Sequence, residues 1–170
     1  ADSKHSSSNA GDGTGTILIA NGAAITTANT TATLIQEKER RTSIKTRYIA
    51  GGQQMMRTDD ETVAPIRNET KQKIIKLVTS GLNNCNALVI ADYAKGVLTP
   101  EITKQLIRLA KKAKVPIIVD PQGADYKPYA GADIITPNRK ELSLATGMPA
   151  NTDKQINTAA RKLISENNIK

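Results

Sequence analysis

Three short apolar runs lie between positions 87 and 135, and each gives way to polar residues at its carboxyl end. They read A-L-V-I-A before Asp92, P-I-I-V before Asp120 and A-D-I-I before Thr136. Short β-branched runs, the first two separated by a helical pattern, are typical of parallel strands with a helical crossover. Ligands bind at the carboxyl edge of open parallel sheets. The sequence therefore predicts an α/β fold with a binding site on that edge.

Four polar side chains fall on the predicted edge: Asp92, Asp120, Asn138 and Glu141. The last two form an Asn-x-x-Glu box after the third run. A helix N-terminus attracts phosphate, and Mg²⁺ keeps several waters that nearby carboxylates can hold, so the box suits a hydrated metal and a phosphate. It also suits a capping box, in which Asn138 and Glu141 only begin a helix. The two interpretations are compatible.

Helical periodicity covers most of the remaining sequence from position 69 onward. Thr99-Pro100 is a typical helix start, with Thr as the N-cap, and Gly147 is a typical helix end. The pattern predicts helices over residues 69–82, 99–113, 138–146 and after Asn151. The inward side chains expected on the last helix are Ile156, Ala159, Ala160, Leu163 and Ile164. The order of elements is then α-β-α-β-β-α-α, which indicates a layered α/β core over residues 69–170.

The amino-terminal part of the chain gives weaker patterns. Residues 1–15 are polar and rich in Ser and Gly, and we expect a flexible lead there. Residues 16–24 suggest a short helix, although Gly22 weakens it. Residues 26–33 are rich in Thr, Ala and Asn and are interpreted as a link.

Alternating side chains between positions 42 and 59 predict a β-hairpin with its turn at Gly51-Gly52. Lys45 and Arg47 are two residues apart, so a strand places both on one face. Two cations on one face suit the phosphate of a sugar phosphate. The alternative is a charged strand face that is only solvated.

Composition limits the classes of function. The 170 residues carry a net charge of +8 and contain one Cys and one His, which argues against an internal disulfide and a zinc site. The lone Cys suits a reducing compartment, and we expect a cytoplasmic location. No apolar run is long enough for a transmembrane helix, and no signal-peptide core is found near the start, so no membrane partner is predicted.

The basic excess is most simply explained by solvated helix faces. Attraction of phosphorylated small molecules is the second explanation, and nucleic acid is the third. The chain has only four Tyr, scattered along it, and no Phe or Trp to stack on bases. Nucleic acid is therefore not expected as a partner.

Four sequence boxes, taken together and in order, resemble a known family. They read K-T-R-Y-I-A-G-G-Q-Q-M-M-R-T-D, A-D-Y-A-K-G, I-V-D-P-Q-G and T-P-N-R-K-E-L. The chain resembles the ribokinase-like (PfkB-type) carbohydrate kinases over roughly residues 11–169. Within them it is most similar to the D-glycero-β-D-manno-heptose 7-phosphate kinases, which act in ADP-heptose synthesis for bacterial lipopolysaccharide.

The resemblance implies a fold, a reaction and partners. The fold is a Rossmann-type three-layer α/β sheet with a small β lid, here the strands at about residues 42–59. The reaction transfers the γ-phosphate of ATP to a sugar hydroxyl with Mg²⁺, and the expected partners are ATP and a sugar phosphate. Lid strands of such kinases often pair between subunits, so a homodimer through the lid is also implied.

The resemblance also implies roles for particular residues. ATP and Mg²⁺ are assigned to Asp120 and the Asn-x-x-Glu box, with Glu141 reaching the metal through water; the box is Asn138, Arg139, Lys140 and Glu141. Asp92 and Lys95 are expected near the phosphoryl acceptor, where Lys95 can neutralise developing charge. The alternative for this pair is a capped turn with a solvated lysine.

The substrate-binding residues implied for the lid are Lys45, Arg47, Arg57 and Asp59. Asp59 is expected to accept hydrogen bonds from sugar hydroxyls. Two positions depart from the family pattern: Gln122 stands where Lys is usual, and Gly52 stands where Asn is frequent. The first departure removes a positive charge beside Asp120.

Two parts of the family pattern are not found in these 170 residues. They are the opening strand with its Gly-Gly-Asn segment, and the G-A-G-D box whose Asp is the family's catalytic base. Ala130-Gly131-Ala132-Asp133 precedes a predicted strand, whereas the family's box opens a helix. We therefore expect a fold that is incomplete at both ends and no kinase turnover by this chain alone. The alternatives are another ribokinase-like sugar or nucleoside kinase, or a non-catalytic nucleotide-binding remnant.

Overall fold

The computed structural model describes residues 15–20, 30–37 and 40–170. Within them the chain forms seven strands and four helices, with two short 3₁₀ turns at Leu82–Asn84 and Lys127–Tyr129. The strands are β1 (Gly15–Ala20), β2 (Thr30–Ile35), β3 (Ile44–Ala50), β4 (Gln53–Asp60), β5 (Leu88–Ala91), β6 (Ile117–Asp120) and β7 (Ile134–Ile135). The helices are α1 (Asn68–Gly81), α2 (Pro100–Ala113), α3 (Arg139–Thr146) and α4 (Asp153–Asn167).

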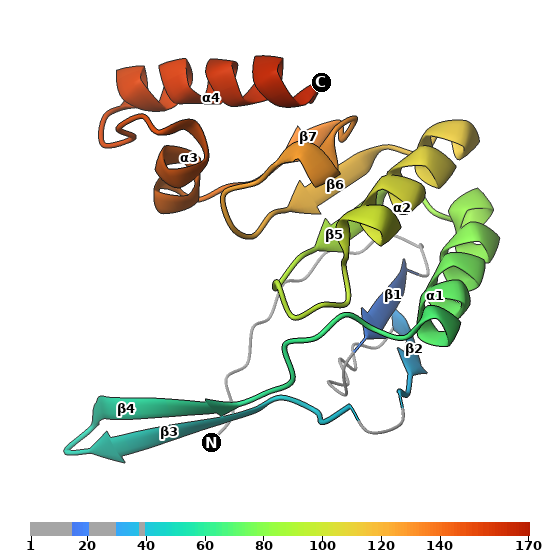
Figure 1. Ribbon diagram of the computed structural model, residues 1–170, viewed down its shortest axis with the longest axis horizontal. Helices are drawn as coiled ribbons and strands as arrows, with labels where there is room; N and C mark the ends of the chain where they lie inside the picture. Colours follow the sequence, from blue (N-terminus) through green and yellow to red (C-terminus); the bar gives the residue numbers. More distant parts are fainter. Residues whose placement is uncertain (1–14, 21–29, 38–39) are drawn as a thin grey trace.

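The predicted parallel strands form a three-stranded sheet in the order β5-β6-β7. Leu88 pairs with Ile117 and Ala91 with Asp120, so β5 and β6 end at the same edge. Figure 1 shows α1 and α2 side by side on one flank of the sheet, with α3 and α4 together toward the other end. The α-β-α-β-β-α-α order predicted from residue 69 onward is confirmed.

The core lies between α2 and the central strand. Ile102 and Ala110 on α2, and Ile117 and Val119 on β6, have no exposed surface. Burying an aliphatic side chain of this size contributes about 1.5–3 kcal/mol. The helix is delimited as predicted, because the Thr99 side chain accepts the Ile102 N–H. One strongly apolar helix face therefore fixes the position of the sheet beneath it.

Two large apolar side chains of the α/β core are exposed, and one of them, Ile164, was expected to be inside. The first apolar run is only half-buried, because Ile90 is inside whereas Val89 on the other face of β5 is 63% exposed. Ile164 is 40% exposed, although Leu163 beside it is buried. Neighbouring residues lie about 100° apart around a helix. The buried face of α4 holds Ala159 and Leu163 and is narrower than predicted, so Ile164 lies at its margin.

A β-hairpin of β3 and β4 projects from the core (Figure 1). Its turn has Gly51 at φ +58° and Gly52 at φ +77°, the two positive values that a tight hairpin turn needs. Every residue of both strands is exposed. A two-stranded hairpin is marginally stable by itself, so its attachment to the core matters.

The amino-terminal predictions are wrong where the structure describes them. The helix expected over residues 16–24 is instead β1 as far as Ala20, and the link expected over 26–33 is β2 from Thr30 onward. The two strands pair in parallel, from Gly15 with Thr30 to Ala20 with Ile35. A short apolar run has no clear period, and a distant partner strand decides its conformation. Residues 1–14, most of the expected lead, lie outside the described residues.

No helix in the described part of the chain has the length and apolar character needed to cross a bilayer.

Candidate functional site

The carboxyl ends of β5 and β6 are joined directly. The Asp92 N–H donates to the Asp120 carbonyl at 2.9 Å. The Thr136 hydroxyl, at the end of β7, donates to the Asp120 carboxylate at 3.2 Å. The sheet thus brings Asp92 and Asp120 to one edge, as the strand pattern predicts.

Two donors hold the Asp92 carboxylate in place. One oxygen accepts the Ala94 N–H at 2.8 Å, and the other accepts the Tyr129 hydroxyl at 2.7 Å. The Tyr129 oxygen in turn accepts the Gln122 N–H at 3.4 Å. One buried side chain therefore connects the loops that follow β5 and β6.

Neither Tyr129 nor its neighbour Tyr126 was among the residues predicted for the site. Their rings pack edge to face, with centroids 5.7 Å apart. Both side chains are buried, and the Tyr126 hydroxyl has no hydrogen-bond partner among the described residues. Two of the chain's four aromatic residues lie close together after D-P-Q-G, which is the signal that could have identified them.

Both tyrosines stay protonated well above neutral pH. Burial, with the nearby charges of Glu141 and Asp120, raises the pKa of Tyr126 to about 12. Burial and the hydrogen bond to Asp92 raise the pKa of Tyr129 further. At neutral pH both hydroxyls therefore act as uncharged groups beside the carboxylates of the edge.

The Asn-x-x-Glu box begins α3 as a capping box. The Asn138 side chain accepts the Glu141 N–H at 2.9 Å, and one Glu141 oxygen accepts the Asn138 N–H at 2.8 Å. The structural interpretation of the box is therefore confirmed, and its nucleotide role stays a prediction.

The amino end of α3 has chemistry that fits a phosphate and a hydrated metal. Arg139 and Lys140 are exposed in its first turn, and Arg139 donates to the Asn151 carbonyl at 3.2 Å. Only Oε2 of Glu141 accepts in the capping box, and no described residue donates to Oε1. That oxygen can accept a metal-bound water without breaking the cap. No cluster of three or more His, Cys, Asp or Glu that could bind a metal directly occurs within the described ranges.

The four lid residues share one face of the hairpin, because Lys45 lies opposite Asp59 and Arg47 lies opposite Arg57. Asp59 pairs with Lys45 at 2.7 Å and with Arg57 at 2.8 Å. The hydrogen bond from Lys45, followed by that from Arg57, lowers the pKa of Asp59. Arg47 makes no ion pair with any described residue, so it is the cation most available to an anionic ligand.

Lys95 is directed to the lid and is not a solvated lysine. Its ammonium pairs with Glu61, just after β4, and the other Glu61 oxygen lies 3.8 Å from the Lys45 ammonium. The sequence reading missed Glu61. Its side chain is only 14% exposed. The loop after β5 and the base of the hairpin are thus connected through one carboxylate.

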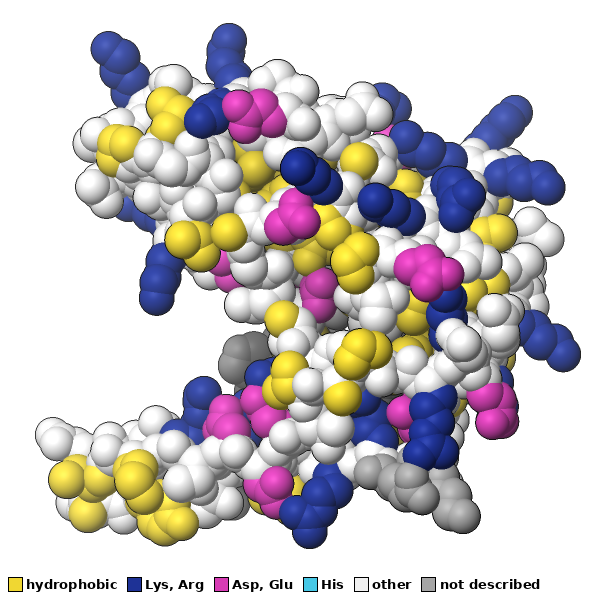
Figure 2. All heavy atoms as spheres, viewed as in Figure 1, with side chains coloured by type: hydrophobic (Ala, Val, Ile, Leu, Met, Phe, Trp, Pro, Cys, Tyr) yellow, Lys and Arg dark blue, Asp and Glu magenta, His cyan; other side chains and the backbone are white. Residues whose placement is uncertain are grey.

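Figure 2 shows where these groups lie on the surface. The molecule is hollowed between the projecting hairpin and the α3–α4 end, and side chains of both signs gather where the hairpin meets the core. The hairpin, which carries the predicted substrate-binding residues of the lid, lies on one side of this hollow, and α3, which begins at the Asn-x-x-Glu box, lies on the other. The arrangement can hold an anionic ligand against the edge of the sheet.

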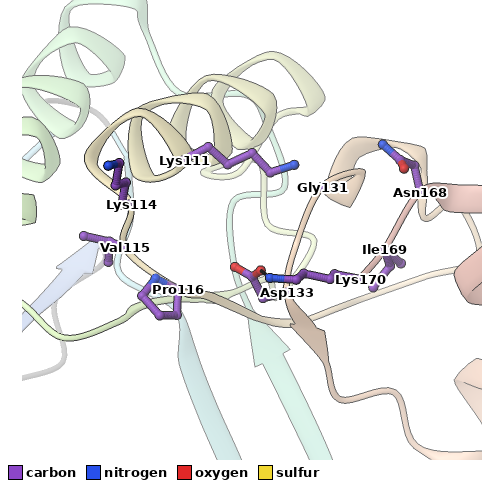
Figure 3. A pocket seen from close by; sticks show the side chains of 9 residues that line it. All are labelled: Lys111, Lys114, Val115, Pro116, Gly131, Asp133, Asn168, Ile169 and Lys170. Atoms are coloured by element: carbon purple, nitrogen blue, oxygen red, sulfur yellow. Dashed lines mark ion pairs between the residues drawn. The ribbon is translucent and has the colours of Figure 1, made fainter.

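A separate cavity of about 620 Å³ lies at the opposite, amino edge of the sheet (Figure 3). Lys111, Lys114 and Lys170 line it together with Asp133, and none of the predicted site residues does. Asp133 accepts the Ile117 N–H at 3.0 Å and pairs with Lys170 at 3.5 Å. Asp133 directly precedes β7 and does not begin a helix. Its position therefore agrees with the prediction that residues 130–133 are not the family's G-A-G-D box.

Comparison with known sequences connects this arrangement to a family. Residues 23–169 match the pfkB family of carbohydrate kinases. The chain is 45% identical over 129 residues to "Bifunctional protein HldE" of Rhodospirillum rubrum, and 40% identical over 133 residues to the protein of that name in Wolinella succinogenes. These alignments cover 76% and 78% of this chain but 26% and 28% of the relatives. The chain thus spans about a quarter of the length of the curated relatives it matches.

Solved structures show the same fold. The tetrameric inhibited form of Escherichia coli phosphofructokinase-2 aligns with a TM-score of 0.63 at 17% identity, over 91% of this chain and 54% of that one. Arabidopsis thaliana ribokinase, complexed with ribose and ATP, aligns with a TM-score of 0.53 at 19% identity, over 83% of this chain and 43% of that one. The predicted ribokinase-like α/β fold is confirmed.

Proposed function

The chain belongs to the pfkB family of carbohydrate kinases, and from this premise we propose that the protein containing it transfers a phosphoryl group from ATP to a heptose phosphate. The proposed acceptor is D-glycero-β-D-manno-heptose 7-phosphate, and the proposed position is O1, in ADP-heptose and lipopolysaccharide core biosynthesis. The observation that carries the proposal is the sheet edge at which Asp92 and Asp120 are joined, with the charges of Asp120 and Glu141 both close to Tyr126, together with a lid that carries cations on one face. The resemblance of the four boxes to heptose 7-phosphate kinases supports the choice of sugar.

The nucleotide side of the site is the amino end of α3. We assign the ATP phosphates to its first-turn N–H groups, with Arg139 and Lys140 adding positive charge. Oε1 of Glu141 would accept a hydrogen bond from a water of the bound Mg²⁺, and we assign Asp120 to the same nucleotide side of the site. When bound, Mg²⁺ offsets negative charge on the transferred phosphoryl group. The protein's contribution is mainly positioning and electrostatics.

The acceptor side of the site is the hairpin with the loop after β5. Arg47 and Arg57 face each other across the strands, so an anion between them relieves their repulsion. We assign them, with Lys45, to the phosphate of the acceptor, and Asp59 to a sugar hydroxyl. Asp92 orients the acceptor hydroxyl, and Lys95 stabilises negative charge that develops there.

Further proposals concern the assembly, the location and the activity of the chain by itself. Tyr48, Ile49, Met55 and Met56 are about half exposed or more on the hairpin, which supports a homodimer in which two lids cover each other. Light scattering at several concentrations tests this, and a monomer throughout would contradict it. The cytoplasm suits a kinase that uses ATP. By itself the 170-residue chain is expected to bind Mg-ATP weakly and to have no turnover.

A coupled assay of ADP release by the full-length protein tests the function. The panel contains the heptose 7-phosphate, fructose 6-phosphate, ribose and a nucleoside, each with Mg-ATP. The proposal expects the highest kcat/KM for the heptose phosphate. Preference for another sugar would favour the first alternative, a different ribokinase-like kinase. ATP binding without ADP release for any sugar would favour the second, a nucleotide-binding remnant.

A further inference from the structure

The guanidinium of Arg40 lies where the hairpin exit meets the loop after β5. It donates to the Ala64 carbonyl at 2.7 Å, to the Thr62 carbonyl at 3.3 Å and to the Lys95 carbonyl. Thr62 and Ala64 belong to the segment that leaves β4, and Lys95 belongs to the loop that carries Asp92. One half-buried side chain therefore joins two segments that are distant in the sequence. Ala64 lies 24 residues from Arg40, and Lys95 lies 55 residues from Arg40.

The backbones of the same two segments are in direct contact. The Ile66 N–H donates to the Gly96 carbonyl at 3.0 Å. Gly96 has φ +83°, and a Cβ built on it would overlap the Ala64 carbonyl and lie 2.8 Å from the Pro65 nitrogen. Only glycine permits this approach. Arg40 therefore strengthens a contact that the backbone already makes.

A third link carries charge. Glu61 pairs with Lys95 from the loop and lies 3.8 Å from Lys45 on the hairpin. The Glu61 carboxylate thus places Lys95 beside Lys45, and this arrangement requires the hairpin exit and the loop to stay together.

Arginine has the properties that this position requires. Its guanidinium is always charged and carries five donors in a rigid plane, so it can serve several carbonyls at once. A lysine ammonium is a single point with rotating donors. It cannot reach the same oxygens in the same geometry.

We propose that Arg40 is a positioning residue that fastens the lid to the loop carrying Asp92 and Lys95, so that the two move as one body around the acceptor. Only the kinetic part of the test rests on the proposed function. The structural part stands by itself.

Hydrogen exchange in the full-length protein tests the coupling without reference to activity. Peptides covering residues 62–66 and 92–98 are followed in wild type, Arg40→Lys and Arg40→Ala. Both peptides are expected to exchange about tenfold faster in each variant, while peptides of α4 stay unchanged. Arg41→Ala is the matched control, because Arg41 is exposed and pairs only with Asp60, at 2.8 Å, among the described residues. Faster exchange in one segment alone, in neither, or equally in the control overturns the proposal.

Kinetics provide the second readout. Loss of Arg40 is expected to raise the KM for the sugar about tenfold, whereas the KM for ATP changes less than about twofold. Equal increases in both values, or full retention of wild-type exchange by Arg40→Lys, overturn the positioning role. If the wild type has no kinase activity, the proposed function fails while hydrogen exchange still decides the coupling. If Arg40→Ala does not fold, Arg40→Lys gives the decision.

Discussion

The Tyr129 hydroxyl donates a 2.7 Å hydrogen bond to the carboxylate of Asp92. The tyrosine follows β6 and the aspartate follows β5, so the bond ties together two loops that border the candidate site. The tyrosine itself is buried in the core. The position of Asp92 therefore depends on a residue that no ligand needs to touch.

Replacing Tyr129 with Phe removes only this hydroxyl. We expect the free energy of unfolding to fall by about 1–2 kcal/mol, because a hydrogen bond to a charged group is lost while water can partly replace it at the half-exposed Asp92. Urea unfolding measures the change. Tyr126→Phe is the matched control, since its hydroxyl has no described partner, and it should be neutral or slightly stabilising. Equal losses in the two variants would contradict the assignment.

The buried tyrosines also predict how stability changes in alkali. The pKa of Tyr126 is about 12 in the folded protein and 10.0 without the shift. A raised folded-state pKa leaves stability intact below pH 10.0 and reduces it above, because the unfolded chain loses the proton first. The slope is about 1.4 kcal/mol per pH unit for one such group.

The measurement compares the unfolding free energies of wild type and Tyr126→Phe from about pH 8 to about pH 11.5, the range in which this linkage acts. The two curves should coincide or run parallel below about pH 10 and diverge above it, with Tyr126→Phe the more stable protein, because only the wild type loses the stability linked to this hydroxyl. Curves that stay parallel throughout would show that Tyr126 ionises equally easily in both states.

The α3 capping box allows structure and nucleotide binding to be separated. Glu141→Gln keeps an acceptor for the Asn138 N–H, so stability should change by less than about 0.5 kcal/mol. It removes the charge facing a hydrated metal, so Mg-ATP affinity should fall about tenfold, as isothermal titration calorimetry would measure.

Thr152→Ala is the control for this experiment. Thr152 and Gln155 form a second capping box, at the start of α4, with no predicted ligand. Its loss should cost about 0.5–2 kcal/mol of stability without changing Mg-ATP affinity. If Glu141→Gln, like Thr152→Ala, leaves Mg-ATP affinity unchanged, the capping box at α3 has only a structural role.

Arg47 is expected to matter for substrate and not for stability. Arg47→Gln removes a cation that lies opposite Arg57, so stability should be unchanged or slightly higher. The KM for the sugar phosphate should rise about tenfold with little change in kcat, because the charge binds ground state and transition state alike. Arg41→Gln, on the exposed approach to the hairpin, should leave the KM unchanged. Similar KM values for all three proteins would remove Arg47 from the site.

The α/β core was predictable because its signals are local. Thr99 caps α2, Gly147 ends α3, and the apolar faces repeat at the spacing of a helix. The Asn138–Glu141 cap was predictable for the same reason. A strand pair such as β1–β2 depends on a partner that no local period reveals.

Most of the missed residues act across long separations. Arg40 meets Lys95 across 55 positions, Lys95 meets Glu61 across 34, and Tyr129 meets Asp92 across 37. The local sequence around each of these residues contains no motif that indicates the distant contact. The polar side chains at the edge were predicted because each directly follows an apolar strand pattern, whereas the partners of Arg40, Glu61 and Tyr129 are shown only by the fold.

The central claim is that the full-length protein moves a phosphoryl group from ATP to a heptose phosphate. Phosphorus NMR of a reaction containing Mg-ATP and D-glycero-β-D-manno-heptose 7-phosphate tests it most directly. The result we predict is ADP and a sugar bisphosphate in equal amounts, with the new phosphate coupled to the proton on C1, and a strongly reduced rate for Glu141→Gln. Unchanged ATP and sugar after prolonged incubation, or ADP formed with free phosphate and no new sugar phosphate, would contradict it.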